Sequence, residues 1–457
     1  MDMKKVNRSM LQGPLFPNIV SYTIPIILTS VLQLLFNAAD LVVVGRFRGS
    51  IALAAVSATG SLTMLIINLF IGISVGAGVS VAHALGGQQH EVTRRTVHTA
   101  IPAALVSGVI VTVIGLLFSE PMLRIMGTPE NVLPLSSLYM KIYFGGITFT
   151  MVYNFCASIL RAAGDTKSPL IFLSLSGVVN VILNVVFVTQ LGMNVEGVAL
   201  ATIISQGISA ALCLIALMRR TDACHLELKK MRFYKPQLLK ILRIGLPAGI
   251  QSSLFSISNV IIQSSINSFG DIFMSGNGAA ANIDGFIYVI FNAFQQTAVN
   301  FVGQNAGAHQ YDRVKKTYVI CLLSGCVLTI GVGALAYTFG PQLLSIYITD
   351  SPQAITYGMI RLAYIALPYF LCALMDITTG ALRGLGASMS PMLISVLGVC
   401  GIRILWIYTI FQIPAYHSPE SLYLSYSISW IITFAFQLLA LILVYRKHTK
   451  FYALTQA

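Results

Sequence analysis

Three carboxylates inside long apolar segments are the residues best placed to do chemistry in this 457-residue chain: Asp40, Asp284 and Asp376. A charged side chain in hydrocarbon costs about 2.5–3.5 kcal/mol on insertion scales, so such residues are rare and are candidates for function. A carboxylate in that position can bind a cation or a proton. These residues therefore predict ion binding inside a membrane.

Asp40 is expected to meet polar residues of two other apolar segments. It lies about 6–9 Å below the outer end of the first segment at a rise of about 1.5 Å per residue. Asn184 of the fifth segment lies at a similar depth, Asn180 lies one turn deeper on the same helix face, and Thr202 lies about 9 Å into the sixth segment. Oxygen ligands around one carboxylate suit Na⁺, and the carboxylate alone suits a proton. We predict a cation-coupling site here; the alternative is a buried network that only holds helices together.

The other two acids have different expected roles. Asp376 lies about 10 Å from the inner end of its segment, and Arg403 is its expected charge partner because an unpaired arginine there would be costly. Both a structural ion pair and a coupling role stay open for these two residues.

Asp284 is predicted to be an acidic contact in a substrate cavity. On the same segment, amides at helical spacing are predicted to line that cavity, because lipid would not tolerate them: Asn292, Gln295, Gln296 and Asn300.

The composition predicts an integral membrane protein. Hydrophobic residues make up 56% of the chain and charged residues 9%, whereas a soluble domain carries about 25% charged residues. Apolar runs of about 20 residues or more recur, which is the length a membrane-spanning helix needs. We predict an all-α protein with twelve spans, at residues 18–44, 54–82, 97–118, 135–160, 169–190, 196–218, 239–267, 277–304, 318–339, 355–383, 390–411 and 422–446.

An internal repeat divides the chain into two halves. The stretch Gly86–Thr96 returns as Gly307–Thr317, and the stretch Leu160–Pro169 returns as Leu382–Pro391. We predict two six-helix lobes, residues 1–218 and 239–457, joined by a basic cytoplasmic linker at residues 219–238. Two such halves are typical of secondary transporters, whose substrate site lies between the repeats.

The positive charge of the chain fits this topology. Most of the 28 lysines and arginines fall in segments that are cytoplasmic if both termini are inside, as the positive-inside rule requires. The net charge of +13 is therefore explained by topology and by contact with anionic membrane lipid, and it needs no nucleic acid. We predict a multi-pass protein of the cell (inner) membrane with both termini in the cytoplasm.

Several motifs together resemble the bacterial multidrug and toxic compound extrusion (MATE) transporters. The resemblance covers nearly the whole chain and rests on Ala38-Ala39-Asp40, Val44-Gly45-Arg46, Ala52-Leu53-Ala54-Ala55-Val56, Leu160-Arg161-Ala162-Ala163-Gly164-Asp165-Thr166 and Gly303-Gln304-Asn305-Ala306-Gly307-Ala308. It implies two pseudo-symmetric six-helix bundles in a V shape around a central cavity. It also implies export of organic, often cationic, compounds in exchange for Na⁺ or H⁺. The family's first-lobe cation site maps onto the group around Asp40. We expect one chain to form the whole pathway, because the duplication supplies both halves.

Two departures from the family pattern stand out. Many relatives carry an aspartate where this chain has Asn184, so the site holds one carboxylate fewer. The NorM-type exporters have a glutamate in the seventh helix, and the seventh segment here holds no acid between Ile250 and Asn267. Coupling through the second lobe in the NorM manner is therefore not expected.

Four other functions fit the sequence less well. A lipid-linked oligosaccharide flippase of the same superfamily would need a cavity with more positive charge. The predicted spans hold one mid-membrane arginine, Arg403, and three acids. A channel would need a continuous polar pore, for which filter-like repeats are missing. An enzyme or an ATP-driven pump is not expected, because the chain has no metal-ligand cluster, nucleophile motif or P-loop. We expect no cofactor besides the coupling ion.

Overall fold

The structure is a computed structural model that describes residues 10–348 and 351–456, and all regular secondary structure in those ranges is helical. The prediction of an all-α protein is thereby confirmed. Helices of the first half are α2 (Leu15–Gly86), α3 (His90–Ile125), α4 (Leu133–Gly145), α5 (Ile147–Ala162), α6 (Lys167–Val185) with η1 (Val186–Gln190) and α7 (Val195–Met218). The connection to the second half contains η2 (Leu228–Lys230), and α8 (Lys235–Asn267) begins the second half. The other helices of the second half are α9 (Asp271–Gly307), α10 (Tyr311–Thr338), α11 (Gly340–Ser345), α12 (Pro352–Arg361) with η3 (Leu362–Ala366), α13 (Tyr369–Gly384), α14 (Met389–Ser395), η4 (Val396–Gly401), α15 (Ile402–Tyr408), η5 (Ile410–Gln412), η6 (Pro414–Tyr416) and α16 (Pro419–Gln456).

Each of the predicted spans lies on a helix or on a bent pair of helices. Within the described ranges, 8 helices are long and apolar enough to cross a membrane, and up to 10 if each bent pair counts as one span. The bent pairs are α4 with α5, at 48°, and α12–η3 with α13, at 41°. Helix α2 contains the first two predicted spans on either side of Gly49, whose φ of 83° breaks the helical backbone. Only a residue without a Cβ adopts that conformation at little cost.

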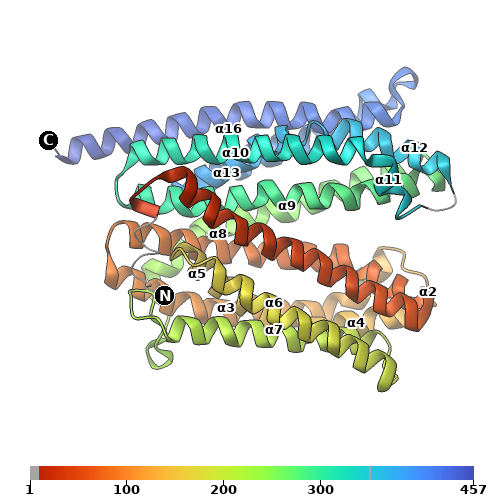
Figure 1. Cartoon of the computed structure of the whole chain (residues 1–457), viewed down its shortest axis with the longest axis horizontal. Helices are drawn as coiled ribbons and strands as arrows, with labels where there is room; N and C mark the ends of the chain where they lie inside the picture. The colour runs from red at the N-terminus through yellow and green to blue at the C-terminus, as the bar shows by residue number, and fades with distance from the viewer. Residues whose placement is uncertain (1–9, 349–350, 457) are drawn as a thin grey trace. The chain divides into compact units, whose positions relative to one another are not determined.

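The described part of the chain divides into two compact units, residue 10 with residues 24–253, and residues 11–23 with 254–348 and 351–456. In the first unit α3 packs against α4 and α5, and α6 packs against α7. In the second unit α9 packs against α10, α12 and α13, and α13 also packs against α16. The helices of each unit run side by side (Figure 1). The lobe boundaries taken from the sequence remain a prediction.

The repeated turns have the same backbone in both halves. Gln88 and His309 occupy corresponding positions of the repeat, and both have positive φ, 54° and 57°. Gly164 and Gly386 also correspond, with φ of 89° and 82°. In the first of these motifs the left-handed residue is Gln88, not the preceding Gly87.

A close helix crossing in the first unit depends on four glycines. A Cβ on Gly72 would collide with the backbone of Gly249, and a Cβ on Gly76 would collide with the backbone at Ile241 and Gly245. Helices in lipid approach this closely where small residues face one another. The second half of α2 and the first half of α8 are therefore joined backbone to backbone.

Replacing Gly72 with alanine should destabilise the protein. The added methyl group has no space, and overpacking of this kind typically costs about 1–3 kcal/mol. The readout is the midpoint of thermal unfolding of the purified protein in detergent. Gly60→Ala on the same helix is the matched control, because a Cβ there meets nothing within 4 Å. Equal midpoints for the two variants would contradict the close crossing.

Candidate cation-coupling site

The four residues predicted to form the cation site come together in the first unit. Helix α2 supplies Asp40, α6 supplies Asn180 and Asn184, and α7 supplies Thr202. The Asn184 Nδ2 group donates to Asp40 Oδ1 at 2.5 Å and lies 3.2 Å from Asn180 Oδ1. The Thr202 hydroxyl lies 3.4 Å from Asp40 Oδ2 and also donates to the carbonyl of Val198 at 3.0 Å. The contact predicted from helix depth alone is therefore present, while its function stays a prediction.

An apolar cluster encloses this group. Val43 and Val44 of α2 pack with Val188 and Val198, and Tyr139 of α4 belongs to the same cluster. Asp40 is 9% exposed, and Asn184 is fully buried. Sequence reasoning missed Tyr139 and its stacked neighbour Tyr143, 6.1 Å away between ring centroids. The four-residue spacing of these tyrosines on one helix face was the available signal.

The electrostatics of the site favour a cation. None of the ion pairs among the described residues involves Asp40. A buried carboxylate without a positive partner is costly, so it gains by binding a cation or a proton. The Asn184 Oδ1 atom is also buried and has no hydrogen-bond partner among the described residues. Together with the oxygens of Asn180 and Thr202, it offers Na⁺ an all-oxygen set of ligands.

Asp284 lies in a second polar network, which belongs to the second unit. Its Oδ2 atom accepts a hydrogen bond from Arg361 Nε at 2.8 Å, and the two side chains are 5% and 13% exposed. Asn277 Oδ1 accepts from Arg361 Nη1 at 2.7 Å and from the hydroxyl of Tyr423 at 2.8 Å. Sequence reasoning missed these three partners, although Asn277 and Asp284 lie seven residues apart on one face of α9. The predicted role of Asp284 as a substrate contact stays a prediction.

The pair predicted between Asp376 and Arg403 is not formed in the described structure. Arg403 Nε donates to the Ser429 hydroxyl at 3.0 Å, and its guanidinium lies 3.9 Å from the ring centroid of Tyr426 and 5.5 Å from that of Trp430. Aromatic faces attract a cation through their quadrupole, most strongly where water is excluded. Arg403 is thus satisfied by rings and a hydroxyl, and Asp376 is 7% exposed without an ion pair in the described ranges.

The predicted amide face of α9 is a ladder of local contacts. Asn292 Nδ2 donates to the Tyr288 hydroxyl at 3.2 Å and to Gln295 Oε1 at 3.3 Å. Gln296 Nε2 donates to Asn292 Oδ1 at 2.8 Å, and Asn300 Nδ2 donates to the carbonyl of Gln296 at 2.9 Å. The ladder places these polar groups along one helix. Their exposure to a substrate cavity remains a prediction.

Comparisons with known proteins identify the family. The MatE family model matches residues 25–186 and 247–409, which together cover more than half of the chain. The chain is 29% identical over 391 residues to the probable multidrug resistance protein YoeA of Bacillus subtilis (strain 168), covering 84% of each chain. It is 24% identical over 400 residues to the FAD transporter of Shewanella oneidensis, covering 86% of this chain and 87% of that protein.

A solved structure has the same fold. It is described as the outward-facing conformation of a multidrug resistance MATE family transporter of the MOP superfamily, and it matches with a TM-score of 0.89 and 21% identity. The match covers 97% of this chain and 99% of that one. At this identity the likeness shows the fold alone, and the family model carries the assignment. The chain belongs to the MatE family, the multidrug and toxic compound extrusion transporters, and is a multi-pass membrane protein.

Proposed function

We propose that this protein is an antiporter that exports organic, chiefly cationic, compounds in exchange for Na⁺ or H⁺. The observation that carries the proposal is the buried carboxylate of Asp40, which holds hydrogen bonds from Asn184 and Thr202 but no ion pair among the described residues. Such a group needs a cation or a proton to become neutral in its apolar surroundings. The site therefore changes its charge when the coupling ion binds or leaves.

Coupling follows if ion binding and substrate binding favour different conformations. Each ligand shifts the equilibrium by its differential affinity for the two states. An ion that neutralises Asp40 stabilises one state, substrate binding stabilises the other, and alternation between them moves the two ligands in opposite directions. In this proposal the chain works as a monomer, and both of its termini lie in the cytoplasm.

Export of organic compounds is supported by the relatives, which are named for multidrug resistance and, in one case, for FAD transport. We favour cationic compounds, because Asp40 in the first unit has no ion pair among the described residues and Arg403 is covered by aromatic rings. The test is efflux of a fluorescent organic cation from proteoliposomes under a Na⁺ gradient and a pH gradient imposed separately. Efflux driven by one gradient identifies the ion. No efflux under either, together with movement of FAD or of a lipid-linked oligosaccharide, would contradict the proposal and favour an anionic substrate or a flippase.

Replacing Asn184 with aspartate should make the protein depend more strongly on the ion. The change removes the amide that donates to Asp40 Oδ1 and puts a second carboxylate at about the same place. Two adjacent carboxylates repel each other unless a cation or a proton lies between them. We expect the thermal midpoint of this variant in detergent to rise more steeply with Na⁺ concentration, or with falling pH, than that of the wild type. Identical dependence in the two proteins would argue against ion binding here.

A further inference from the structure

Arg48 joins α2 to η1 just beyond the predicted ion site, within the first unit. It lies eight residues after Asp40 on α2, and its Nη2 atom donates to the backbone carbonyl of Val188 at 2.5 Å. Val188 belongs to η1, the π-helical turn that begins two residues after Asn184. Helix α2 and the α6–η1 helix are therefore linked twice, by Asp40 with Asn184 and by Arg48 with Val188. The proposed transport function does not use the second link.

The carbonyl of Val188 needs a donor from outside its own helix. The last carbonyl groups of a helix have no partner within it. The carbonyl of Val186 accepts from the backbone N–H of Leu191 at 3.1 Å, whereas that of Val188 accepts from Arg48. Val188 is 1% exposed, so without Arg48 its carbonyl would be buried and unpaired, which is costly. A cation at this end of a helix also opposes the negative end of the helix dipole. Arg48 therefore stabilises η1 in its observed position.

The length of the arginine side chain matches this geometry. At about 1.5 Å per residue, Arg48 lies about 12 Å beyond Asp40 along α2, whereas Val188 lies roughly 6 Å beyond Asn184 along α6 and η1. Side chains of a helix point back toward its N-terminus. An extended arginine can therefore reach back over the difference of about 6 Å and bind the carbonyl. We expect a glutamine at this position to be too short.

The link to Val188 also bears on the enclosure of the ion site. Val188 packs with Val43 and Val44 of α2 in the apolar cluster around Asp40. It does so from a π-helical turn, and such turns are rare and often occur at functional sites. Because Asn184 lies just before this turn, a shift of η1 would move Asn184 relative to Asp40.

We propose that Arg48 is a positioning residue of the ion site: its hydrogen bond to Val188 fixes η1 and so holds Asn184 against Asp40. This inference rests on the proposed function. The charge of Arg48 has the opposite expected effect, because a nearby positive charge repels a bound cation. Removing the charge alone would raise the affinity for the ion, whereas losing the hydrogen bond would lower it. The sign of the change therefore separates the two roles.

The test measures the thermal midpoint of the purified full chain in detergent as a function of Na⁺ concentration and, without Na⁺, as a function of pH. The ion response is the difference from Asp40→Asn, which lacks the ionisable group. Loss of a group that orients metal ligands typically weakens metal binding by about 10–100-fold. Arg48→Gln should therefore need about tenfold more Na⁺, or a pH about one unit lower, for the same response. Arg48→Lys keeps the charge and a donor and should lie between Arg48→Gln and the wild type.

A charge control comes from the same helix. Arg46→Gln removes the same charge from an exposed residue of α2 that has no hydrogen bond to η1 in the described structure. It should bind the ion at least as tightly as the wild type does, because only the repulsion is removed.

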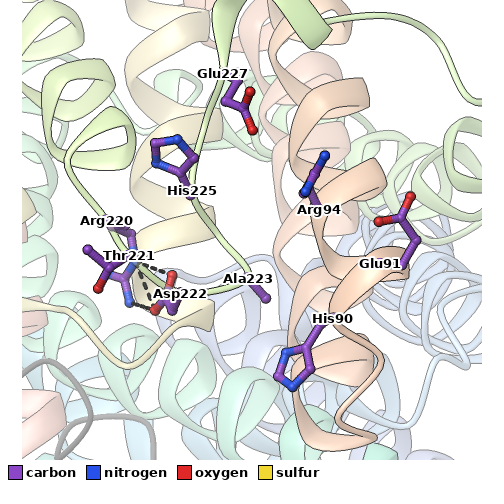
Figure 2. Close-up of a pocket in the computed structure, with 9 residues that line it drawn as sticks. All are labelled: His90, Glu91, Arg94, Arg220, Thr221, Asp222, Ala223, His225 and Glu227. Carbon is purple, nitrogen blue, oxygen red and sulfur yellow. Dashed lines mark hydrogen bonds and ion pairs between the residues drawn. The ribbon is translucent and has the colours of Figure 1, made fainter.

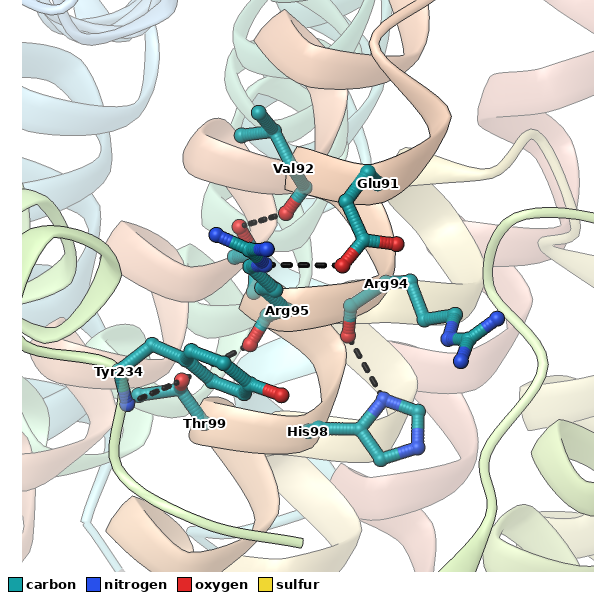
Figure 3. Close-up of polar contacts among 8 residues, drawn as sticks. Glu91, Val92, Arg94, Arg95, His98, Thr99 and Tyr234 are labelled. Carbon is teal, nitrogen blue, oxygen red and sulfur yellow. Dashed lines mark hydrogen bonds and ion pairs between the residues drawn. The ribbon is translucent and has the colours of Figure 1, made fainter. Parts of the chain in front are cut away.

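A stability control comes from another contact of the first unit. The Thr99 hydroxyl of α3 accepts from the backbone N–H of Tyr234 at 3.2 Å (Figure 3). A cavity of about 440 Å³ lies between the start of α3 and the connection that contains Tyr234, and none of its lining residues belongs to the ion site (Figure 2). Thr99→Val should lower the midpoint at every ion concentration without changing the ion response.

The pattern across variants decides the outcome. The expected result is a weaker ion response in Arg48→Gln, partly restored in Arg48→Lys, with no weakening in either control. An ion response in Arg48→Gln as strong as that of the wild type, or equal weakening in Arg46→Gln, would overturn the positioning role and leave the proposed function intact. If Arg48→Gln does not fold, Arg48→Lys carries the test, and a wild-type response there would overturn the role. No difference between the wild type and Asp40→Asn would overturn the proposed function, and this inference with it.

Discussion

The Asp40→Asn variant should lose ion-driven efflux entirely while it still folds and inserts. Asparagine has nearly the shape of aspartate, so Asn184 and Thr202 keep a hydrogen-bonding neighbour. The change removes the ionisable group, and with it any difference in ion affinity between the two conformations. Without that difference an ion gradient cannot shift the equilibrium. Efflux from proteoliposomes should therefore fall to the level of vesicles without protein, under a Na⁺ gradient and under a pH gradient alike.

The matched control for this experiment is Asp312→Asn, which removes the same charge from an exposed residue in the first turn of α10. It should transport as the wild type does. A thermal midpoint of Asp40→Asn close to that of the wild type would show that the loss is one of coupling. Normal ion-driven efflux by Asp40→Asn would remove the basis of the proposed function.

Single substitutions in the pair of Asp284 and Arg361 should destabilise the second unit strongly. The two side chains are 5% and 13% exposed and 2.8 Å apart. Removing one partner leaves the other charge buried and uncompensated, which typically costs about 3–5 kcal/mol. Asp284→Asn alone and Arg361→Gln alone should each lower the thermal midpoint in detergent. The double variant should lie closer to the wild type than either single variant does, because neither charge then remains.

This comparison also separates a structural role for Asp284 from the predicted role as a substrate contact. A substrate contact would weaken substrate binding in Asp284→Asn without a large change in thermal midpoint, and Arg361→Gln would not restore it. A double variant less stable than both single variants would contradict the account of a charge pair. The same set of proteins can be tested for efflux, so that stability and transport are compared directly.

The sequence predicted the architecture well because the membrane imposes strong rules on it. Spans of about 20 apolar residues must be helical in hydrocarbon, and every predicted span lies on a helix or on a bent pair of helices. Depth along each helix was also enough to bring Asp40, Asn180, Asn184 and Thr202 together, since helical rise is nearly constant. Positions along a helix axis are thus predictable from spacing alone.

Contacts between helices were less predictable, because depth does not determine which faces meet. Asp376 and Arg403 were predicted to pair because their charges are opposite. In the structure, Arg403 instead packs against the rings of Tyr426 and Trp430. Arg361 is the ion-pair partner of Asp284, and it lies at the end of α12, where the chain continues into η3. The rotation of each helix about its axis decides these contacts. That rotation depends on packing with several neighbours at once.

The duplication preserved the backbone of the chain but not its buried charges. The turn residues Gln88 and His309 share positive φ, yet Asp40 corresponds in the repeat to Ile262, and Asp284 corresponds to Thr63. Each unit has a buried carboxylate at a position where the other has an uncharged side chain. The first carboxylate has no ion pair among the described residues and the second is paired with arginine. This asymmetry explains why we place ion coupling in the first unit.

The most direct test of antiport is the reverse experiment, in which substrate drives the ion. Proteoliposomes loaded with an organic cation, and with no gradient of Na⁺ or pH, would be diluted into substrate-free buffer while an internal dye reports Na⁺ or pH. Because coupling is reciprocal, substrate leaving the vesicles should drive the coupling ion inward in the wild type and not in Asp40→Asn. Substrate that leaves through the wild-type protein without any movement of Na⁺ or H⁺ would contradict cation-coupled antiport.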